Sequence, residues 1–446
     1  AGPRPAEHSR RAGPAGDACT GPLSRVGGVS DLVTPAEAAL LAHDQDAAPW
    51  QHALVMVLGG GLDRAELAAR IAERLDYAPR FRRVVTGWPV AGWVDDANFN
   101  LDGHLHEVTL ASGQRLETWL AAELRTRLPR NHPLWQVVLV RGLPGGAQAV
   151  VVRVNPAMID GYDHIHLFQE LFEDQPDERI PSPAQPWQPT QMAAPDFAAV
   201  LSGLTDPVAA AERAVGGVLG FLESGLRSVT PPPEHELYLA GTDVDFAKLS
   251  AIRDRHGCTI HDVVVALATA GIRRWQRDRG VEPSDPLALV PLAITEPQVL
   301  DSAIGCRIAP SFDRLPVTTE SPAARLEAIA TLTVSRRESG LSVPARDLMD
   351  LAGFAPATVH AVAAGTISAG RPHTATVVNV PGPDRPRYLG RARVRQIFAA
   401  TTPTDAEEIT VTINSYQGRV SLTAAAIAPL PSWTTAIIAE LAALGA

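Results

Sequence analysis

The sequence predicts an α/β or α+β protein with mixed sheets, because helix and strand patterns interleave in both halves of the chain. The 446 residues are 46% hydrophobic and 20% charged, which is typical of a globular chain with room for two or three domains. Proline is concentrated between about residues 175 and 235. This enrichment predicts a connection between two halves.

The first half shows two helix starts and several strand patterns. Thr34 with Glu37 forms a capping pattern, and Asp63 does the same before the apolar positions Leu67, Ile71 and Leu75. We expect strands at Gln51–Leu58, His104–Leu110, Gln136–Arg141 and Ala147–Val154, and further helices at Leu116–Leu124 and Asp163–Phe172.

The second half repeats the alternation after a linker helix expected near Val208–Leu226. Thr259 and Asp262 predict a capped helix that follows a strand at Leu237–Val244. We expect further strands at Leu287–Ile294, Thr374–Val380, Glu408–Ser415 and Arg419–Ala425, and a last helix at about Ser432–Leu444.

Charge and residue usage disfavour several function classes. The 39 basic and 49 acidic residues give a net charge of −10, which argues against a nucleic-acid binder. The single lysine, Lys248, excludes a Walker A loop and disfavours Schiff-base chemistry. Three scattered cysteines form neither a disulfide framework nor a zinc pattern. His104 and His106 lack a visible third ligand, so we expect no metal.

The chain carries no recognisable targeting pattern. Residues 1–25 are rich in Ala, Gly, Pro and Arg and predict a disordered tail. This stretch lacks the apolar core of a signal peptide, and the longest uncharged run, Leu351–Gly370, is interrupted by Pro356 and His360. We therefore expect a cytoplasmic protein.

Two segments flank the strand pair of the first half. His132-Pro133-Leu134-Trp135 precedes it and Asn155-Pro156-Ala157-Met158-Ile159-Asp160-Gly161 follows it. With these segments the chain resembles the wax ester synthase/diacylglycerol acyltransferase family, which is related to CoA-dependent acyltransferases and condensation domains. The resemblance runs from about Asp31 and includes Trp93–Asp96, Phe99–Asp102, Thr259–Val264, Leu289–Pro291, Gly305–Ile308 and Asn379–Pro383.

The resemblance implies two chloramphenicol-acetyltransferase-like halves with a tunnel between them. The domains would be 26–190 and 237–446, joined by a crossover at 191–236. The tunnel would take an acyl thioester, on CoA or a carrier protein, as substrate with no bound cofactor. The acidic net charge and the lack of a long apolar run predict neither a nucleic-acid partner nor a transmembrane segment, and peripheral contact with a membrane stays open.

The active-site motif of the family is degenerate in this chain. The family pattern is His-His-x-x-x-Asp-Gly, and its second His is the general base. Here Asn155 and Pro156 occupy the two His positions, while Asp160 and Gly161 remain. Proline cannot accept a proton, so the base of the family is absent. The resemblance implies that Asp160 is an ion-pair partner and Gly161 a turn residue.

Several neighbouring residues are candidates for the lost chemistry. We expect Tyr162 or His164 to transfer the proton and Asn155 to donate a hydrogen bond to an oxyanion. A packed core histidine is the commoner outcome for His164, which shares a helix face with Phe168. His132 and Trp135 are candidate substrate-binding residues, and we expect Asn379 to have a structural role.

Three functions remain open on the sequence. The first is a diverged enzyme that esterifies, condenses or cyclises an acyl or polyketide-like substrate in specialised metabolism. The second is acyl-CoA:alcohol O-acyltransfer with a substitute base, as in lipid metabolism. The third is a non-catalytic binding protein that keeps the tunnel.

Overall fold

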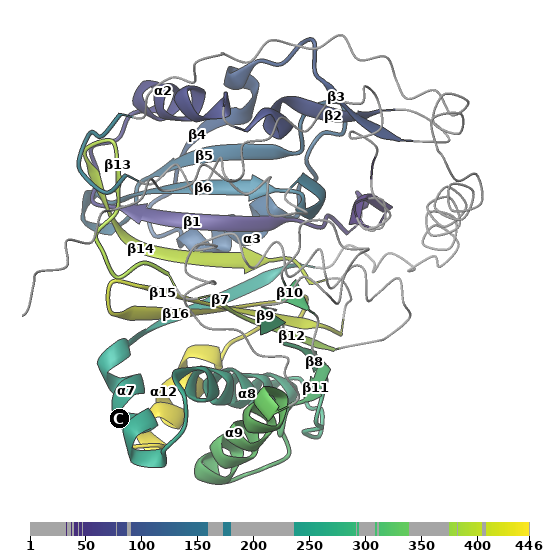
Figure 1. The fold of residues 1–446 in the computed structure, drawn as a ribbon, viewed down its shortest axis with the longest axis vertical. Coiled ribbons are helices and arrows are strands. Elements are labelled where there is room, and N and C mark those ends of the chain that lie inside the picture. Colours follow the sequence, from purple (N-terminus) through teal and green to yellow (C-terminus); the bar gives the residue numbers. More distant parts are fainter. Residues whose placement is uncertain are drawn as a thin grey trace, which may run out of the picture.

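The structure is a computed structural model, and it describes most of both halves. The described residues are 33, 37, 40–42, 44–46, 48–76, 78–86, 91–158, 173–179, 236–290, 292–293, 308–309, 312–338, 374–380, 382–403 and 407–445. The expected tail, the linker helix and the helix at Asp163–Phe172 lie outside these residues, as does the crossover up to residue 235. Of the helix expected from Thr34, residues 37 and 40–42 are described, and they are helical. Figure 1 shows two layered halves, one above the other.

A six-stranded mixed sheet, here called the first sheet, organises the first half. Only β4 and β5 run parallel among its paired strands; the other pairs are antiparallel. In spatial order its strands are β13 (Tyr388–Leu389), β14 (Ala392–Thr401), β1 (His52–Leu58), β6 (Gln148–Val154), β5 (Trp135–Arg141) and β4 (Leu105–Thr109).

Helices cover both faces of the first sheet. Helix α2 (Arg64–Leu75) begins where Asp63 Oδ1 accepts a 2.7 Å hydrogen bond from Glu66 N, as the capping pattern predicts. Its buried stripe packs with Leu54 and Val152 in one core, while helix α3 (Leu116–Leu124) packs on the opposite face. The described part of this half also contains a small β2–β3 hairpin (Arg83–Thr86 and Gly92–Asp95) and four 3₁₀ turns: η1 (Pro79–Arg82), η2 (Leu101–His104), η3 (Pro144–Gly146) and η4 (Pro156–Met158).

A second six-stranded mixed sheet organises the second half. Its strands are β11 (Phe312–Arg314), β8 (Leu287–Leu289), β12 (Ala375–Val380), β15 (Ile409–Tyr416), β16 (Arg419–Ala426) and β7 (Tyr238–Asp245), and β12 runs parallel to both neighbours. The short strands β9 (Leu292–Ala293) and β10 (Ile308–Ala309) pair separately.

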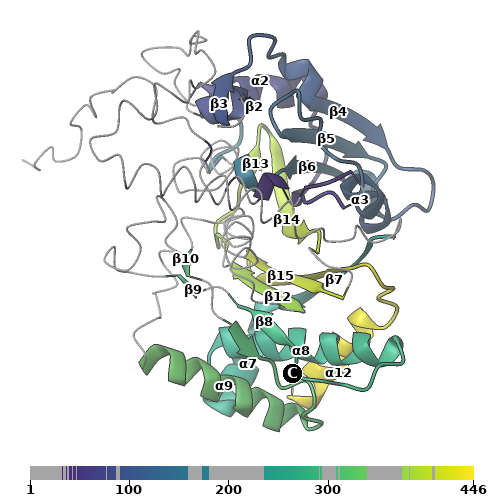
Figure 2. The same cartoon turned by 90° about the vertical axis from the view of Figure 1, so that its right-hand side faces the viewer.

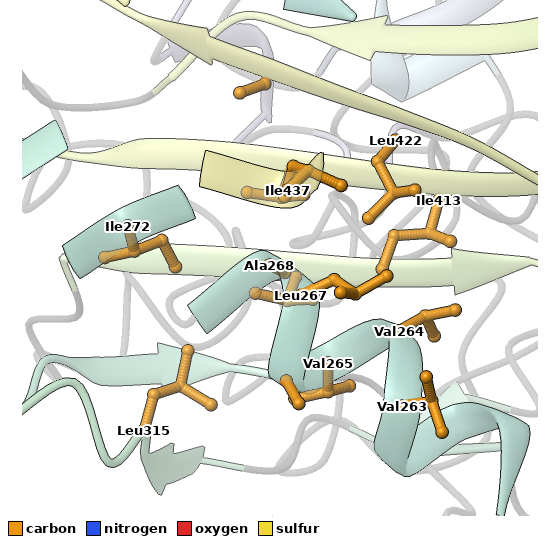
Figure 3. Close-up of a cluster of buried hydrophobic side chains, with 14 of the residues drawn as sticks. Val263, Val264, Val265, Leu267, Ala268, Ile272, Leu315, Ile413, Leu422 and Ile437 are labelled. Atoms are coloured by element: carbon orange, nitrogen blue, oxygen red, sulfur yellow. The ribbon is translucent and has the colours of Figure 1, made fainter. Parts of the chain in front are cut away.

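Within the described residues, four helices lie on the outer face of the second sheet: α7 (Phe246–His256), α8 (Ile260–Asp278), α9 (Pro322–Glu338) and α12 (Trp433–Ala443) (Figures 1 and 2). Helix α8 starts with the predicted capping box between Thr259 and Asp262. The apolar residues of α8 pack against alternate side chains of the second sheet, and Figure 3 shows Val264 and Leu267 beside Ile413. The prediction of two mixed-sheet halves is confirmed.

The two halves share a strand. β14 comes from the second half of the sequence, yet it pairs with β1 of the first sheet. The expected domain at 237–446 therefore does not close on itself. The outer edge of β14 is covered by polar side chains of β15: Asn414 Oδ1 accepts from Ala399 N at 3.1 Å, and Thr410 Oγ1 donates to Thr401 O at 2.7 Å. These bonds satisfy an otherwise open strand edge.

Candidate functional site

Asn155 ends β6 as a buried turn residue. Only 1% of its surface is exposed. Its Oδ1 accepts a 2.9 Å hydrogen bond from Ala157 N, and its Nδ2 donates to Trp50 O at 3.5 Å. Its backbone N donates to Leu134 O at 2.9 Å. The Oδ1 bond lies within the turn, an arrangement in which Asn imitates a backbone turn, and the Nδ2 bond ties the turn to the residue before β1.

Pro156 opens η4 directly after Asn155. It is buried, as are the two residues that follow it. Proline suits the first position of such a turn because its φ is already set and no N–H is needed there. We call residues 155–158 the motif loop, because they include the positions of the two family histidines. Neither Asn155 nor Pro156 carries a titratable group, so neither can act as a general base. The described part of this loop forms the turn.

A buried arginine holds the motif loop from the side of η1. Arg80 Nη2 donates to Ala157 O at 3.3 Å and forms an ion pair with Glu37. The Arg80 guanidinium also lies 3.4 Å from the ring centroid of Trp93. Sequence reasoning did not identify Arg80, since only the fold brings it to the loop.

The rest of the motif lies outside the described residues. This holds for Asp160, Gly161, Tyr162 and His164. The proposed roles of these four residues therefore stay predictions.

The two predicted substrate-binding residues differ in environment. The His132 side chain is 51% exposed, and its Nδ1 lies 4.0 Å from Asp96 Oδ2. Trp135 is fully buried, donates from Nε1 to Phe81 O at 2.8 Å and stacks on His104 at a centroid distance of 4.3 Å. Trp135 has the contacts of a core side chain, and its role as a substrate-binding residue stays a prediction.

His104 belongs to the core as well. It closes η2 instead of opening the strand, and its Nδ1 donates to Trp135 O at 2.8 Å. Burial lowers the pKa of His104 below its usual value, against the opposing effect of this hydrogen bond. His106 is exposed on β4. Within the described residues, no group of three side chains is arranged to hold a metal ion.

A second buried histidine lies next to the motif loop, and sequence reasoning missed it. His52 is the first residue of β1 and is 0% exposed. It is paired with Val154, the last residue of β6, and on its other side with Thr401 of β14. Its Nδ1 lies 2.8 Å from Thr401 Oγ1. The local sequence does not reveal the position of His52, because β1 pairs with strands about 100 and 350 residues away in the chain.

Asn379 lies on β12 in the second half. Its Nδ2 is 3.2 Å from His261 Nδ1, at the beginning of α8. The contact joins the carboxyl end of β12 to the amino end of that helix. Val378, the residue before it, belongs to the apolar cluster of the first half, so this end of β12 lies where the halves meet.

The described residues form two mixed-sheet halves, with the motif loop at the end of β6. The sequence profile of the wax ester synthase/diacylglycerol acyltransferase catalytic domain matches residues 35–264, and the C-terminal domain profile matches residues 304–430. The chain belongs to the wax ester synthase/diacylglycerol acyltransferase family.

Particular relatives support this assignment. A Mycobacterium tuberculosis protein, provisionally named a diacylglycerol O-acyltransferase, is 28% identical over 403 residues, which are 80% of this chain and 77% of the relative. The wax ester synthase/diacylglycerol acyltransferase of Marinobacter aquaeolei VT8 has a similar fold, with a TM-score of 0.63 at 19% identity, over 93% of this chain and 98% of that chain. Polyketide synthase associated protein 5 of Mycobacterium tuberculosis matches with a TM-score of 0.55 at 16% identity, over 94% and 99%.

No helix in the part of the chain that the structure describes has both the length and the apolar character needed to cross a membrane.

Proposed function

We propose that the chain is a diverged acyltransferase-type enzyme of specialised metabolism. Its substrate is an acyl thioester or a polyketide-like molecule, which it esterifies, condenses or cyclises without the histidine base of the family. Family membership and the catalytic-domain match at residues 35–264 support the reaction class. The thioester is carried by CoA or by a carrier protein, and the protein works in the cytoplasm.

The observation that carries this proposal is the state of the motif loop. Asn155 and Pro156 occupy the positions of the two family histidines, and both are buried. Among the described residues, the Asn155 amide bonds to backbone groups, Ala157 N within the turn and Trp50 O beside β1. Loss of a general base typically costs about 10²–10⁴ in rate, so a retained reaction needs either another proton acceptor or chemistry that needs none.

The second candidate function is ordinary acyl-CoA:alcohol O-acyltransfer with a substitute base. The curated relatives favour it, since their names assign diacylglycerol O-acyltransfer. It differs from the first candidate in its acceptor, a simple alcohol or diacylglycerol. A non-catalytic binding protein is the third candidate, and the missing histidines favour it.

The test uses the purified chain with palmitoyl-CoA and an acceptor. Release of free CoA is followed with a thiol reagent, and products are identified by mass spectrometry with 1-hexadecanol, with dioleoylglycerol or without acceptor. Acceptor-dependent CoA release together with an ester supports acyl transfer. Absence of CoA release, despite binding seen as a raised unfolding temperature, would favour the binding protein. Neither binding nor turnover would overturn the proposed enzyme.

A further inference from the structure

His52 lies next to the motif loop, from which the histidine base of the family is missing. Its direct partner in the β1–β6 ladder is Val154, the residue immediately before the motif loop. Side chains at directly opposed positions have Cβ atoms about 4.5–5.5 Å apart. Pro156, where the family has its base, follows two residues later, at most about 7 Å farther along the chain.

Strand alternation assigns the His52 side chain to a particular face of the first sheet. Leu54 and Met56, two and four residues on, belong to the apolar cluster that also contains Val154 and Met158. Alternate residues of a strand share a face, so the His52 ring lies on the side of the motif loop. The residues between them, such as Ala53, face the opposite cluster, under α3.

The same face is where the two halves of the chain meet. Val378 of β12 belongs to the cluster of Leu54 and Val154, although it comes from the second sheet. β14, which carries the Thr401 partner of His52, also contacts β15 through Thr410. His52 is therefore placed at the junction of the halves as well as beside the motif loop, and ligands favour such junctions.

We propose that His52 is the proton acceptor of this site, in place of the histidine that the motif has lost. The inference rests on the proposed acyl transfer. In this role the ring carries its own proton on Nδ1, with Thr401 Oγ1 as acceptor at 2.8 Å, and Nε2 is the basic nitrogen. Thr401 is then a positioning residue that fixes the tautomer and the ring orientation.

The reaction balances with this single residue. The acceptor hydroxyl oxygen forms a bond to the thioester carbonyl carbon, and the hydroxyl proton passes to Nε2 of His52. The C–S bond then breaks, and the leaving thiolate takes the proton back from the imidazolium. The products are an ester and a free thiol, and His52 returns to its neutral form.

Other described histidines of the first half fit this role less well. His104 is bonded to Trp135 O within the core, and His132 is half exposed next to Asp96. His106 is exposed on β4, at the far edge of the sheet. His106 is therefore a suitable control for the substitution of a histidine.

The experiment compares acceptor-dependent CoA release from palmitoyl-CoA by the full chain and by variants. His52→Gln keeps a polar side chain of similar size; its kcat should fall by roughly 10²–10⁴, with little change in the KM for palmitoyl-CoA. His106→Gln should match the wild type. Imidazole in the buffer should restore part of the rate of His52→Ala. Thr401→Val should lower kcat, and Thr401→Ser, which keeps the hydroxyl, should recover it.

The results distinguish a failure of the role of His52 from a failure of the proposed acyl transfer. If the wild type transfers the acyl group and folded His52→Gln does so at a similar rate, His52 is not the acceptor, although the proposed function stands. A loss of rate in His164→Ala or Tyr162→Phe with His52→Gln unaffected would move the role to that residue. A wild type that never releases CoA overturns acyl transfer from CoA and, with it, the role of His52. Loss of rate without imidazole rescue, in step with a lowered folded fraction, would make His52 a purely structural residue.

Discussion

Asn155→Ala tests the claim that this residue holds the motif loop. The substitution removes the acceptor of the buried Ala157 N–H, and the Oδ1–N distance of 2.9 Å marks a well-formed bond. An unsatisfied buried donor costs about 1–3 kcal/mol. The bond from Nδ2 to Trp50 O, at 3.5 Å, is long and should add little. We therefore expect the free energy of unfolding to fall by about 1–3 kcal/mol.

Urea unfolding followed by tryptophan fluorescence measures this change. Asn98→Ala is the matched control, because Asn98 is exposed and its side chain bonds no other residue among those that the structure describes. The control should stay within about 0.5 kcal/mol of the wild type. A similarly small change in Asn155→Ala would refute the argument.

The turnover of the same variant separates the two roles considered for Asn155. A residue that only shapes the turn should leave much of the rate per folded molecule. An oxyanion donor, as the sequence led us to expect, should cost about 10²–10³ in kcat when removed. A loss of that size in a folded Asn155→Ala protein would restore Asn155 to the catalytic residues.

Three further predictions concern buried contacts outside the motif loop. Burial lowers the pKa of His104, so the folded state favours the neutral ring. The stability that this contributes is present above the pKa of the unfolded state, about 6.5, and is lost as the pH falls below that value. Between about pH 7.5 and 5.5, the free energy of unfolding measured in urea should therefore fall less for His104→Gln than for the wild type. Gly271→Ala places a Cβ 2.2 Å from the Trp433 ring, and calorimetry should show a destabilisation of about 1–3 kcal/mol. Arg325→Met breaks the buried pair with Glu440 and should cost about 3–5 kcal/mol, most of which the double variant with Glu440→Leu should recover.

Local patterns in the sequence were enough to predict much of the fold. The caps at Asp63 and Thr259 are confirmed, and β1 and β6 lie within a residue of their predicted starts. These elements are specified by capping side chains and by alternation over a few residues. β14 was missed, although Val394 alternates there with exposed arginines. Its place in the first sheet is a long-range pairing with β1 that no local pattern contains.

The candidate site was harder to predict, because its neighbours come from distant segments. The sequence identified the loss of the histidines at Asn155 and Pro156, since that is a matter of residue type. It could not place Arg80 on Ala157 O or His52 beside Val154, because both depend on how elements pack and pair. Trp135 was expected near substrate on the strength of its motif, yet it packs on His104 in the core.

The location of the acyl group is the most direct test of the account. A crystal structure of the full chain with a thioether analogue of palmitoyl-CoA, which cannot be cleaved, would show where the reacting carbon lies. We expect this carbon to lie on the face of the first sheet that carries His52, beside Val154 and Met158. Density for the analogue elsewhere, or no binding at saturating concentration, would contradict it.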